Sequence, residues 1–138
     1  MSWDYSTSAV YFLTINTAQR SRLLSRIVQA QVMLFPLGEI VTACWRGIPG
    51  HVPGVELGRF VVMPDHVHGV LMLPRGARSL SYLVAHFKGA VTRQAREAVT
   101  SVPGRIWQRS FHDRIIRSPA EWQRIDQYIA DNPARWTG

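Results

Sequence analysis

The side chains best suited to metal chemistry are two histidines one residue apart, His66 and His68, which follow Pro64-Asp65. In an extended strand, side chains two positions apart point to the same face, so the two imidazoles can lie next to each other. Neutral imidazole is a common ligand of divalent metal ions. Paired histidines also occur on ordinary solvated strands, so this spacing favours a metal site without establishing one.

A second group of reactive side chains lies near the C-terminus, where apolar residues recur at helical spacing. Tyr128 and Asn132 are four residues apart and Arg124 lies one turn earlier, so a helix would bring all three toward one face. A tyrosine can act as a nucleophile, an amide oxygen can ligate a metal, and an arginine can hold a phosphate. The plain alternative is a half-buried tyrosine followed by an Asn-Pro helix end. Pro133 disfavours helical angles at Asn132, which is therefore expected to be the last residue of the helix.

The charge of the chain indicates the kind of partner that these groups would serve. The formal net charge is +7, and every basic residue except Lys88 is an arginine. Positive charge favours a polyanionic partner, because each neutralised phosphate releases condensed counterions. Between residues 105 and 117 arginines alternate with aromatic residues, an arrangement typical of single-strand binding; the alternative is a core strand with solvated arginines outside. We predict DNA contacts for five residues: Lys88, Arg109, Arg114, Arg117 and Arg124.

The apolar pattern predicts the elements that must position these groups. Strands are expected at 9–16, 55–63, 66–73 and 111–116, with a loop at 46–54. Helices are expected from Thr17 to Pro36 and Gly38, from Ser79 to Pro103-Gly104, and from Ser118 onward, where Ser118 and Glu121 have capping-box spacing. The order β-α-β-β-α-β plus a C-terminal helix predicts an α+β, ferredoxin-like split βαβ sandwich, with the added helix carrying Tyr128. That fold serves many functions, so the function has to be argued from the site.

Length and composition limit the organisation of the chain. Its 138 residues have room for a single domain, expected to span residues 1–138. No apolar run reaches membrane-spanning length, and the N-terminus lacks the features of a secretory signal. The lone cysteine, Cys44, cannot form an internal disulfide. We therefore expect a reduced, cytoplasmic protein with no membrane partner.

Four segments, taken in order along the chain, resemble the single-tyrosine HUH transposase family, and in particular its REP-associated branch. They are Tyr11-Phe12-Leu13-Thr14, Met63-Pro64-Asp65-His66-Val67-His68, the stretch from Trp107 to Arg117, and Tyr128-Ile129-x-x-Asn132-Pro133. The resemblance covers nearly the whole chain.

The resemblance implies a role for each matching residue. His66 and His68 match the metal-binding pair of the family, Tyr128 its nucleophile, and Asn132 the polar residue that completes the metal site. In that family the tyrosine attacks a DNA phosphate, which leaves a 5′-phosphotyrosine link and a free 3′-hydroxyl that allows rejoining or strand transfer. The implied substrate is single-stranded DNA with imperfect hairpins, such as REP-like sequences or insertion-sequence ends, in the bacterial nucleoid. The implied cofactor is Mg²⁺ or Mn²⁺, of which Mn²⁺ accepts imidazole ligands more readily.

Two other functions stay open at this point. One is a non-catalytic module, since ferredoxin-like sheets also bind single-stranded nucleic acid by aromatic stacking. The other is a metal-dependent hydrolase in which His66 and His68 activate water and Tyr128 is structural. The oligomeric state is open as well: the resemblance is compatible with a homodimer that exchanges the tyrosine helix and with a monomer.

Overall fold

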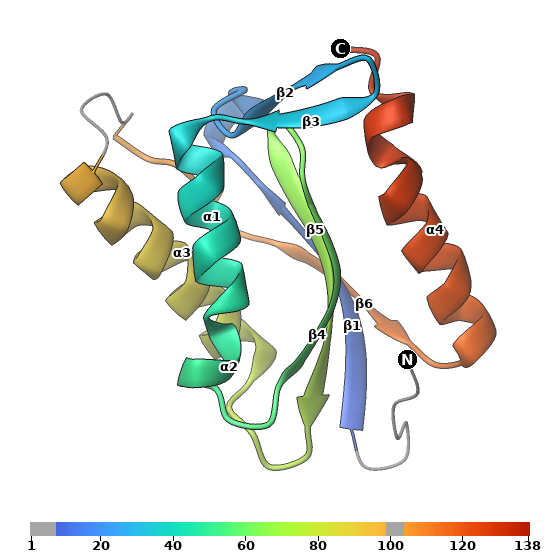
Figure 1. The fold of residues 1–138 in the computed structure, drawn as a ribbon. Coiled ribbons are helices and arrows are strands. Elements are labelled where there is room, and N and C mark those ends of the chain that lie inside the picture. The colour runs from blue at the N-terminus through green and yellow to red at the C-terminus, as the bar shows by residue number, and fades with distance from the viewer. Residues whose placement is uncertain (1–7, 99–103) are drawn as a thin grey trace.

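A central antiparallel sheet with helices on both faces organises the protein (Figure 1). The structure, a computed structural model, describes residues 8–98 and 104–138. The elements in chain order are β1 (Ser8–Asn16), the 3₁₀ turn η1 (Ala18–Arg20), β2 (Ser25–Val28), β3 (Gln31–Leu34), α1 (Pro36–Arg46), α2 (Ile48–His51), β4 (Glu56–Val62), β5 (His66–Pro74), α3 (Leu80–Ala98), β6 (His112–Ile116) and α4 (Pro119–Arg135).

The sheet has the strand order β4-β5-β1-β6, and all of its neighbouring strands are antiparallel. Numbered among the sheet strands alone, this order is 2-3-1-4, the arrangement of the split βαβ fold. The predicted ferredoxin-like class is therefore confirmed, and the four predicted strands match β1, β4, β5 and β6 to within one residue at each end. In this register Thr14 of β1 lies opposite His68 on one side and His112 on the other.

The alternation of side chains along the strands builds two cores. On one face, α1 and α3 pack against the sheet through residues such as Trp45 and Phe87. On the other face, Ile125 and Ile129 of α4 pack against alternate strand residues that include Val70. Each of these isoleucines is almost fully buried, and burial of such a side chain contributes about 1.5–3 kcal/mol. The second core therefore holds α4, the helix that carries Tyr128, against the sheet.

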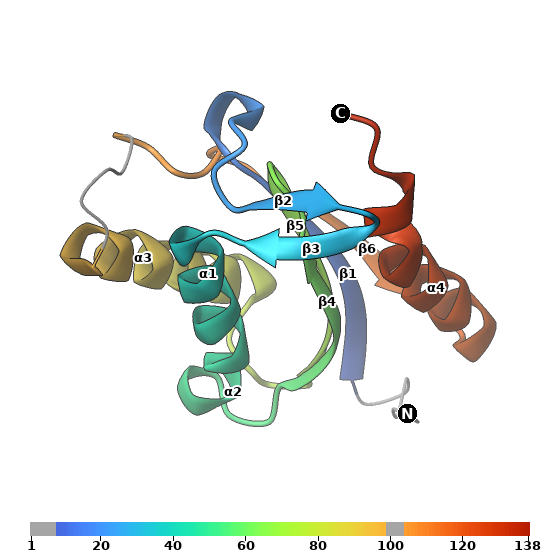
Figure 2. The same ribbon diagram turned by 45° about the horizontal axis from the view of Figure 1, so that its top comes forward.

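The helix predicted from Thr17 to Pro36 is wrong: this segment forms the hairpin β2–β3. Its turn consists of Gln29 and Ala30, whose φ angles of 51° and 63° are those required at both central residues of a type I′ turn. Figures 1 and 2 show the hairpin lying across one end of the sheet and reaching the C-terminal part of α4. The apolar residues at helical spacing were strand residues of a hairpin, stabilised by contacts outside the segment.

The residues expected to end that helix lie inside the next one. Pro36 is the first residue of α1, a position where a proline costs no hydrogen bond, and Gly38 follows within the first turn. A β-carbon on Gly38 would overlap the carbonyl oxygen of Leu24, so this glycine allows close packing of the helix against the chain. The predicted loop 46–54 also contains the four-residue helix α2.

The predicted start of the C-terminal helix is correct, but its predicted end is wrong. Ser118 caps α4 as predicted, and its hydroxyl accepts a hydrogen bond from the Glu121 amide at 3.2 Å. The helix does not end at Asn132 but continues through Pro133 to Arg135. The predicted end of the preceding helix at Pro103 lies outside the described residues. Within the described ranges, no helix is both long enough and apolar enough to cross a membrane.

Candidate active site

The two histidines lie at the start of β5, on the face of the sheet that α4 covers. Their side chains point the same way because they alternate with Val67, which faces the opposite core. His66 and His68 are 8% and 7% exposed, and their ring centroids are 4.7 Å apart. The sequence-based prediction that the two imidazoles are neighbours on one face agrees with this geometry.

A hydrogen bond at Nδ1 orients each imidazole. His66 Nδ1 lies 2.7 Å from Asp65 Oδ1, and His68 Nδ1 lies 2.9 Å from Thr14 Oγ1. The Asp65 carboxylate only accepts, so it sets the tautomer of His66, whereas the Thr14 hydroxyl can donate or accept and orients the His68 ring. In both rings the nitrogen left for a ligand is Nε2. Asp65 and Thr14 thus complete a site of which sequence analysis identified only the histidines.

The electrostatics of the site favour neutral imidazole at His68. Burial, together with the positive charges of His66 and Arg20, lowers the pKa of His68 to about 4, so the ring is neutral at neutral pH. Burial alone would raise the pKa of Asp65, but hydrogen bonds from His66 and Arg20 and their charges hold it below its usual value. The aspartate is therefore an anion that orients a histidine, as in many carboxylate–histidine–metal sites.

Arg20 reaches this site from a strained turn. Gln19 and Arg20 both have left-handed φ angles, 57° and 52°, which are unfavourable for such side chains. Arg20 Nη2 lies 3.2 Å from Asp65 Oδ2 and 3.5 Å from His66 Nδ1. Strained backbone of this kind is concentrated at functional sites. Nothing in the local sequence pattern identified Arg20, because its partners lie more than 40 residues away in the chain.

Tyr128 lies on α4 against His68. Its ring centroid is 5.7 Å from that of His68 and 6.1 Å from that of Phe12, which also stacks on His68. The side chain is 43% exposed, so a large substrate can reach it. The structure therefore brings together three residues predicted from sequence: His66, His68 and Tyr128.

Asn132 lies one turn beyond Tyr128 and is buried. Its Nδ2 donates a hydrogen bond of 2.8 Å to the backbone oxygen of Tyr128, which leaves the amide oxygen for another partner. Among the described residues, the hydrogen bond of its side chain is thus to Tyr128. Within the same part of the chain, no three His, Cys, Asp or Glu residues lie together as a metal site. A metal at the histidines would need further oxygen ligands from Asn132, water or substrate.

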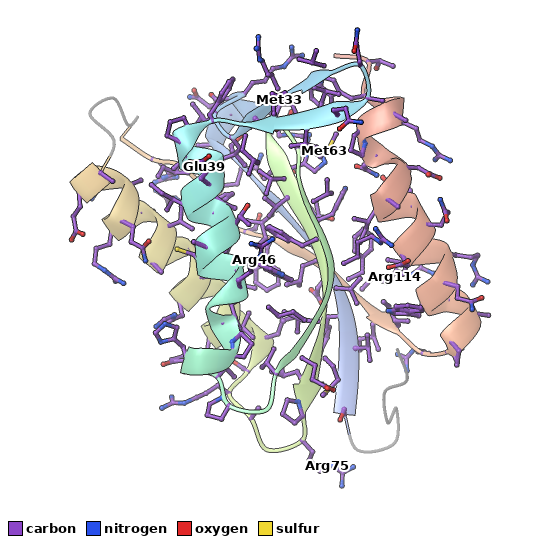
Figure 3. All side chains as sticks on the ribbon, in the orientation of Figure 1. Met33, Glu39, Arg46, Met63, Arg75 and Arg114 are labelled. Atoms are coloured by element: carbon purple, nitrogen blue, oxygen red, sulfur yellow. The ribbon has the colours of Figure 1, made fainter. Side chains whose placement is uncertain are left out.

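Ion pairs anchor α4 to the two edge strands of the sheet at residues that precede Tyr128. Arg59 of β4 binds Asp126 through two contacts, Nε–Oδ1 at 2.9 Å and Nη2–Oδ2 at 3.2 Å. At the start of the helix, Glu121 accepts from Arg114 at 3.3 Å and from the Arg117 amide at 3.2 Å. Figure 3 shows Arg114 lying between the sheet and α4. These contacts fix the helix that carries Tyr128.

The five residues predicted to contact DNA lie in two regions. Arg114 and Arg117, on and just after β6, and Arg124, on α4, lie on the side of the tyrosine helix. Lys88 and Arg109 lie on the α3 side and line one cavity. The ammonium of Lys88 donates to the backbone oxygens of Gln108 and Ser110 at 2.8 and 3.0 Å, which ties α3 to the segment that carries Arg109.

Comparisons with known proteins bear on this site. Residues 50–132 match the family model described as IS200-like transposase. An uncharacterized protein of Haemophilus influenzae is 31% identical, and the alignment covers 97% of this chain and 85% of that protein. The REP-associated tyrosine transposase of Escherichia coli is 25% identical over 95% of this chain and 70% of its own length. The solved structure of a REP-associated tyrosine transposase bound to a REP hairpin has a similar fold, with a TM-score of 0.73 at 23% identity over 98% of this chain and 72% of that chain.

Proposed function

Because the chain belongs to the IS200-like transposase family, we propose that it cleaves and rejoins hairpin-bearing single-stranded DNA through Tyr128, at a divalent metal bound by His66 and His68. The observation that carries the proposal is the placement of an exposed tyrosine ring against the buried imidazole of His68, which is itself 4.7 Å from that of His66. Of the tyrosines that the structure describes, Tyr82 lies elsewhere, on α3 beneath Arg78, and Tyr11 packs with the opposite core. Tyr128 is therefore the candidate nucleophile.

The residues present fit a divalent metal. Two imidazoles have their Nδ1 atoms held by Asp65 and Thr14, and the amide oxygen of Asn132 is one turn from Tyr128. Two nitrogen ligands and one oxygen ligand leave coordination positions for phosphate oxygens, and this donor set suits Mn²⁺ better than Mg²⁺. A metal bound there would polarise the scissile phosphate and offset the negative charge that develops on it during attack.

In the proposed reaction the phenolic oxygen of Tyr128 forms a bond to phosphorus while the bond from phosphorus to the 3′-oxygen breaks. The phenol loses its proton and the departing 3′-oxygen gains one, so the products are a 5′-phosphotyrosine and a free 3′-hydroxyl. Attack of a 3′-hydroxyl on this link reverses the step and rejoins or transfers the strand. The ion pair of Arg59 with Asp126 keeps the tyrosine over the histidines during both steps.

The histidines and the tyrosine come from one chain in this arrangement. The proposed reaction therefore does not require a second copy, although a homodimer is compatible with it. The same proposal covers the whole chain as one catalytic domain, acting on nucleoid DNA in a bacterial cytoplasm.

The experiment that tests this proposal compares two tyrosines of equal exposure. Tyr128 is 43% exposed on α4 and Tyr82 is 41% exposed on α3. A labelled hairpin oligonucleotide with single-stranded flanks is incubated with protein and Mn²⁺, and covalent adducts are separated on a denaturing gel. We expect an adduct with the wild type and with Tyr82→Phe, and none with Tyr128→Phe, which still binds the DNA.

The other outcomes separate the competing functions. An adduct with Tyr128→Phe would refute the assignment of the nucleophile. Cut DNA without an adduct in the wild type would favour a hydrolase that activates water at the histidines. Tight DNA binding with neither cut nor adduct, with Mn²⁺ or Mg²⁺, would favour a binding module.

A further inference from the structure

A groove outside the candidate active site runs between the second half of α3 and residues 104–109. Its volume is about 750 Å³. Basic residues dominate its polar lining, and Glu97 is the one carboxylate among its described lining residues; the basic residues are Lys88, Arg93, Arg96, Arg105 and Arg109. We call it the α3 groove.

Two smaller hollows extend the α3 groove in both directions. One, of about 580 Å³, is lined by Gln19, Ser21, Arg105 and Arg109 among others. The other, of about 380 Å³, is lined by residues that include Arg109 and Phe111. Because Arg109 lines all three, the hollows lie next to one another along residues 104–111.

The segment along these hollows is held rigidly. The Ala18 amide donates to the Ile106 oxygen at 2.8 Å, and the Gln108 amide donates to the Asn16 oxygen at 2.9 Å. The ammonium of Lys88 binds the backbone oxygens on both sides of Arg109. A cation presented on a fixed segment loses little conformational entropy when it binds a ligand.

Among the described residues, the cations along the groove form no ion pair with a carboxylate. Arginines near α4 and the histidines have carboxylate partners, as in the pairs of Arg20 with Asp65 and of Arg59 with Asp126. For Arg93, Arg105 and Arg109, by contrast, the described ranges 8–98 and 104–138 offer no carboxylate within 4 Å. Much of the excess positive charge is therefore available here to a polyanion, and a concave surface strengthens its field.

We propose that the α3 groove binds the phosphate backbone of DNA and leads it to the histidines. The inference rests on the proposed function, namely that the chain acts on DNA. Gln19 and Ser21, which line one of the hollows, flank Arg20 in the chain, and the Arg20 guanidinium contacts Asp65 and His66. The aromatic floor residue Trp107 is buried and cannot stack on a base. The groove thus positions DNA through phosphates and does not read its sequence.

The test removes two charges inside the groove and, as a matched control, two charges outside it. Arg105→Gln with Arg109→Gln is compared with Arg46→Gln with Arg75→Gln. Figure 3 shows Arg46 on α1, and Arg75 beyond the end of β5. Affinity for a fluorescent hairpin oligonucleotide is measured by anisotropy over a series of salt concentrations, and adduct formation is measured at saturating DNA.

We expect the groove pair to lower the slope of log affinity against log salt by about 1.5, because each lost phosphate contact removes about 0.7–0.9. This corresponds to about 30-fold weaker binding at 0.1 M salt, equally for hairpins of different sequence. The control pair should leave the slope within about 0.3 of the wild type, since charges beyond about 10 Å are screened. Adduct formation at saturating DNA should be retained by the control pair.

Equal slopes of log affinity against log salt for the two double variants would refute the proposal that the groove binds DNA, while leaving the proposed function intact. A loss of affinity confined to one hairpin sequence would also overturn it, because the groove would then read bases. If the groove pair lowered the salt slope but the wild type formed no adduct, the proposed function would be refuted and the proposal that the groove binds DNA would stand. If the folded wild type bound no DNA, both would fail.

Discussion

The hydrogen bond between Thr14 and His68 offers a sharp test of how the metal-binding histidines are positioned. Thr14 Oγ1 lies 2.9 Å from His68 Nδ1, and the two residues are opposite each other in the pairing of β1 with β5. Valine has nearly the shape of threonine and a similar preference for strands. Thr14→Val therefore removes one hydrogen bond and leaves the sheet and the ligand nitrogen in place.

The expected loss of Mn²⁺ affinity follows from the type of hydrogen bond that each variant removes. A neutral hydrogen bond contributes about 1 kcal/mol, or about fivefold in an equilibrium constant, so Thr14→Val should weaken Mn²⁺ binding by about fivefold. The contact of Asp65 with His66 is shorter, 2.7 Å, and involves a carboxylate, so it contributes roughly twice as much. Asp65→Asn should therefore weaken Mn²⁺ binding by about 30-fold, within the range seen for outer-shell partners of metal-binding histidines.

The assay is calorimetric titration of the folded protein with Mn²⁺, with circular dichroism to verify the fold of each variant. Thr42→Val is the matched control, because Thr42 donates a comparable hydrogen bond of 3.0 Å to the Gly38 oxygen within α1, on the opposite face of the sheet. If Thr14→Val bound Mn²⁺ as tightly as Thr42→Val, the idea that the Nδ1 partner orients His68 would be wrong.

Two further predictions concern stability and are measured by urea unfolding. A β-carbon at Gly69 would lie 2.5 Å from the ring of Trp45, so the overpacking in Gly69→Ala should lower the free energy of unfolding by about 1–3 kcal/mol. At Gly89 on α3 a β-carbon would meet nothing within 4 Å, so Gly89→Ala should raise the free energy of unfolding by about 0.5–1 kcal/mol. Equal changes in stability at the two glycines would contradict the close contact of Gly69 with Trp45 of α1. Replacing Gln29-Ala30 with Asn-Gly, which tolerate the positive φ angles of the hairpin turn, should raise stability by about 1 kcal/mol; an unchanged unfolding midpoint would argue against strain there.

The hairpin shows why one region was misread from sequence. Apolar residues between 23 and 35 recur at helical spacing, and the turn contains neither glycine nor asparagine, so no local signal marks Gln29-Ala30 as a turn. The segment becomes a hairpin through contacts with distant parts of the chain. The Leu24 amide donates to the Pro64 oxygen, and the Ser25 hydroxyl donates to the Val62 oxygen. Such contacts outweigh a weak local preference.

The sequence by itself determined what depends on short-range periodicity. The period of two along β5 puts both imidazoles on one face, and the apolar spacing of Ile125 and Ile129 decides which face of α4 is buried. The order of strands and helices likewise predicted the fold class. These features follow from local geometry, which is the same wherever the segment is placed.

Only the tertiary structure decided what surrounds the histidines. Thr14 and Arg20 reach them across 54 and 46 residues of chain, and Tyr128 reaches His68 across the second core. Asp65 is adjacent in sequence, yet its carboxylate is identified as a histidine partner only by its 2.7 Å contact. The same holds for the α3 groove, whose arginines come from two segments, α3 and residues 104–111, and line one hollow only when these segments pack side by side. Local periodicity fixes the direction in which a side chain points, but its neighbours depend on how distant segments pack.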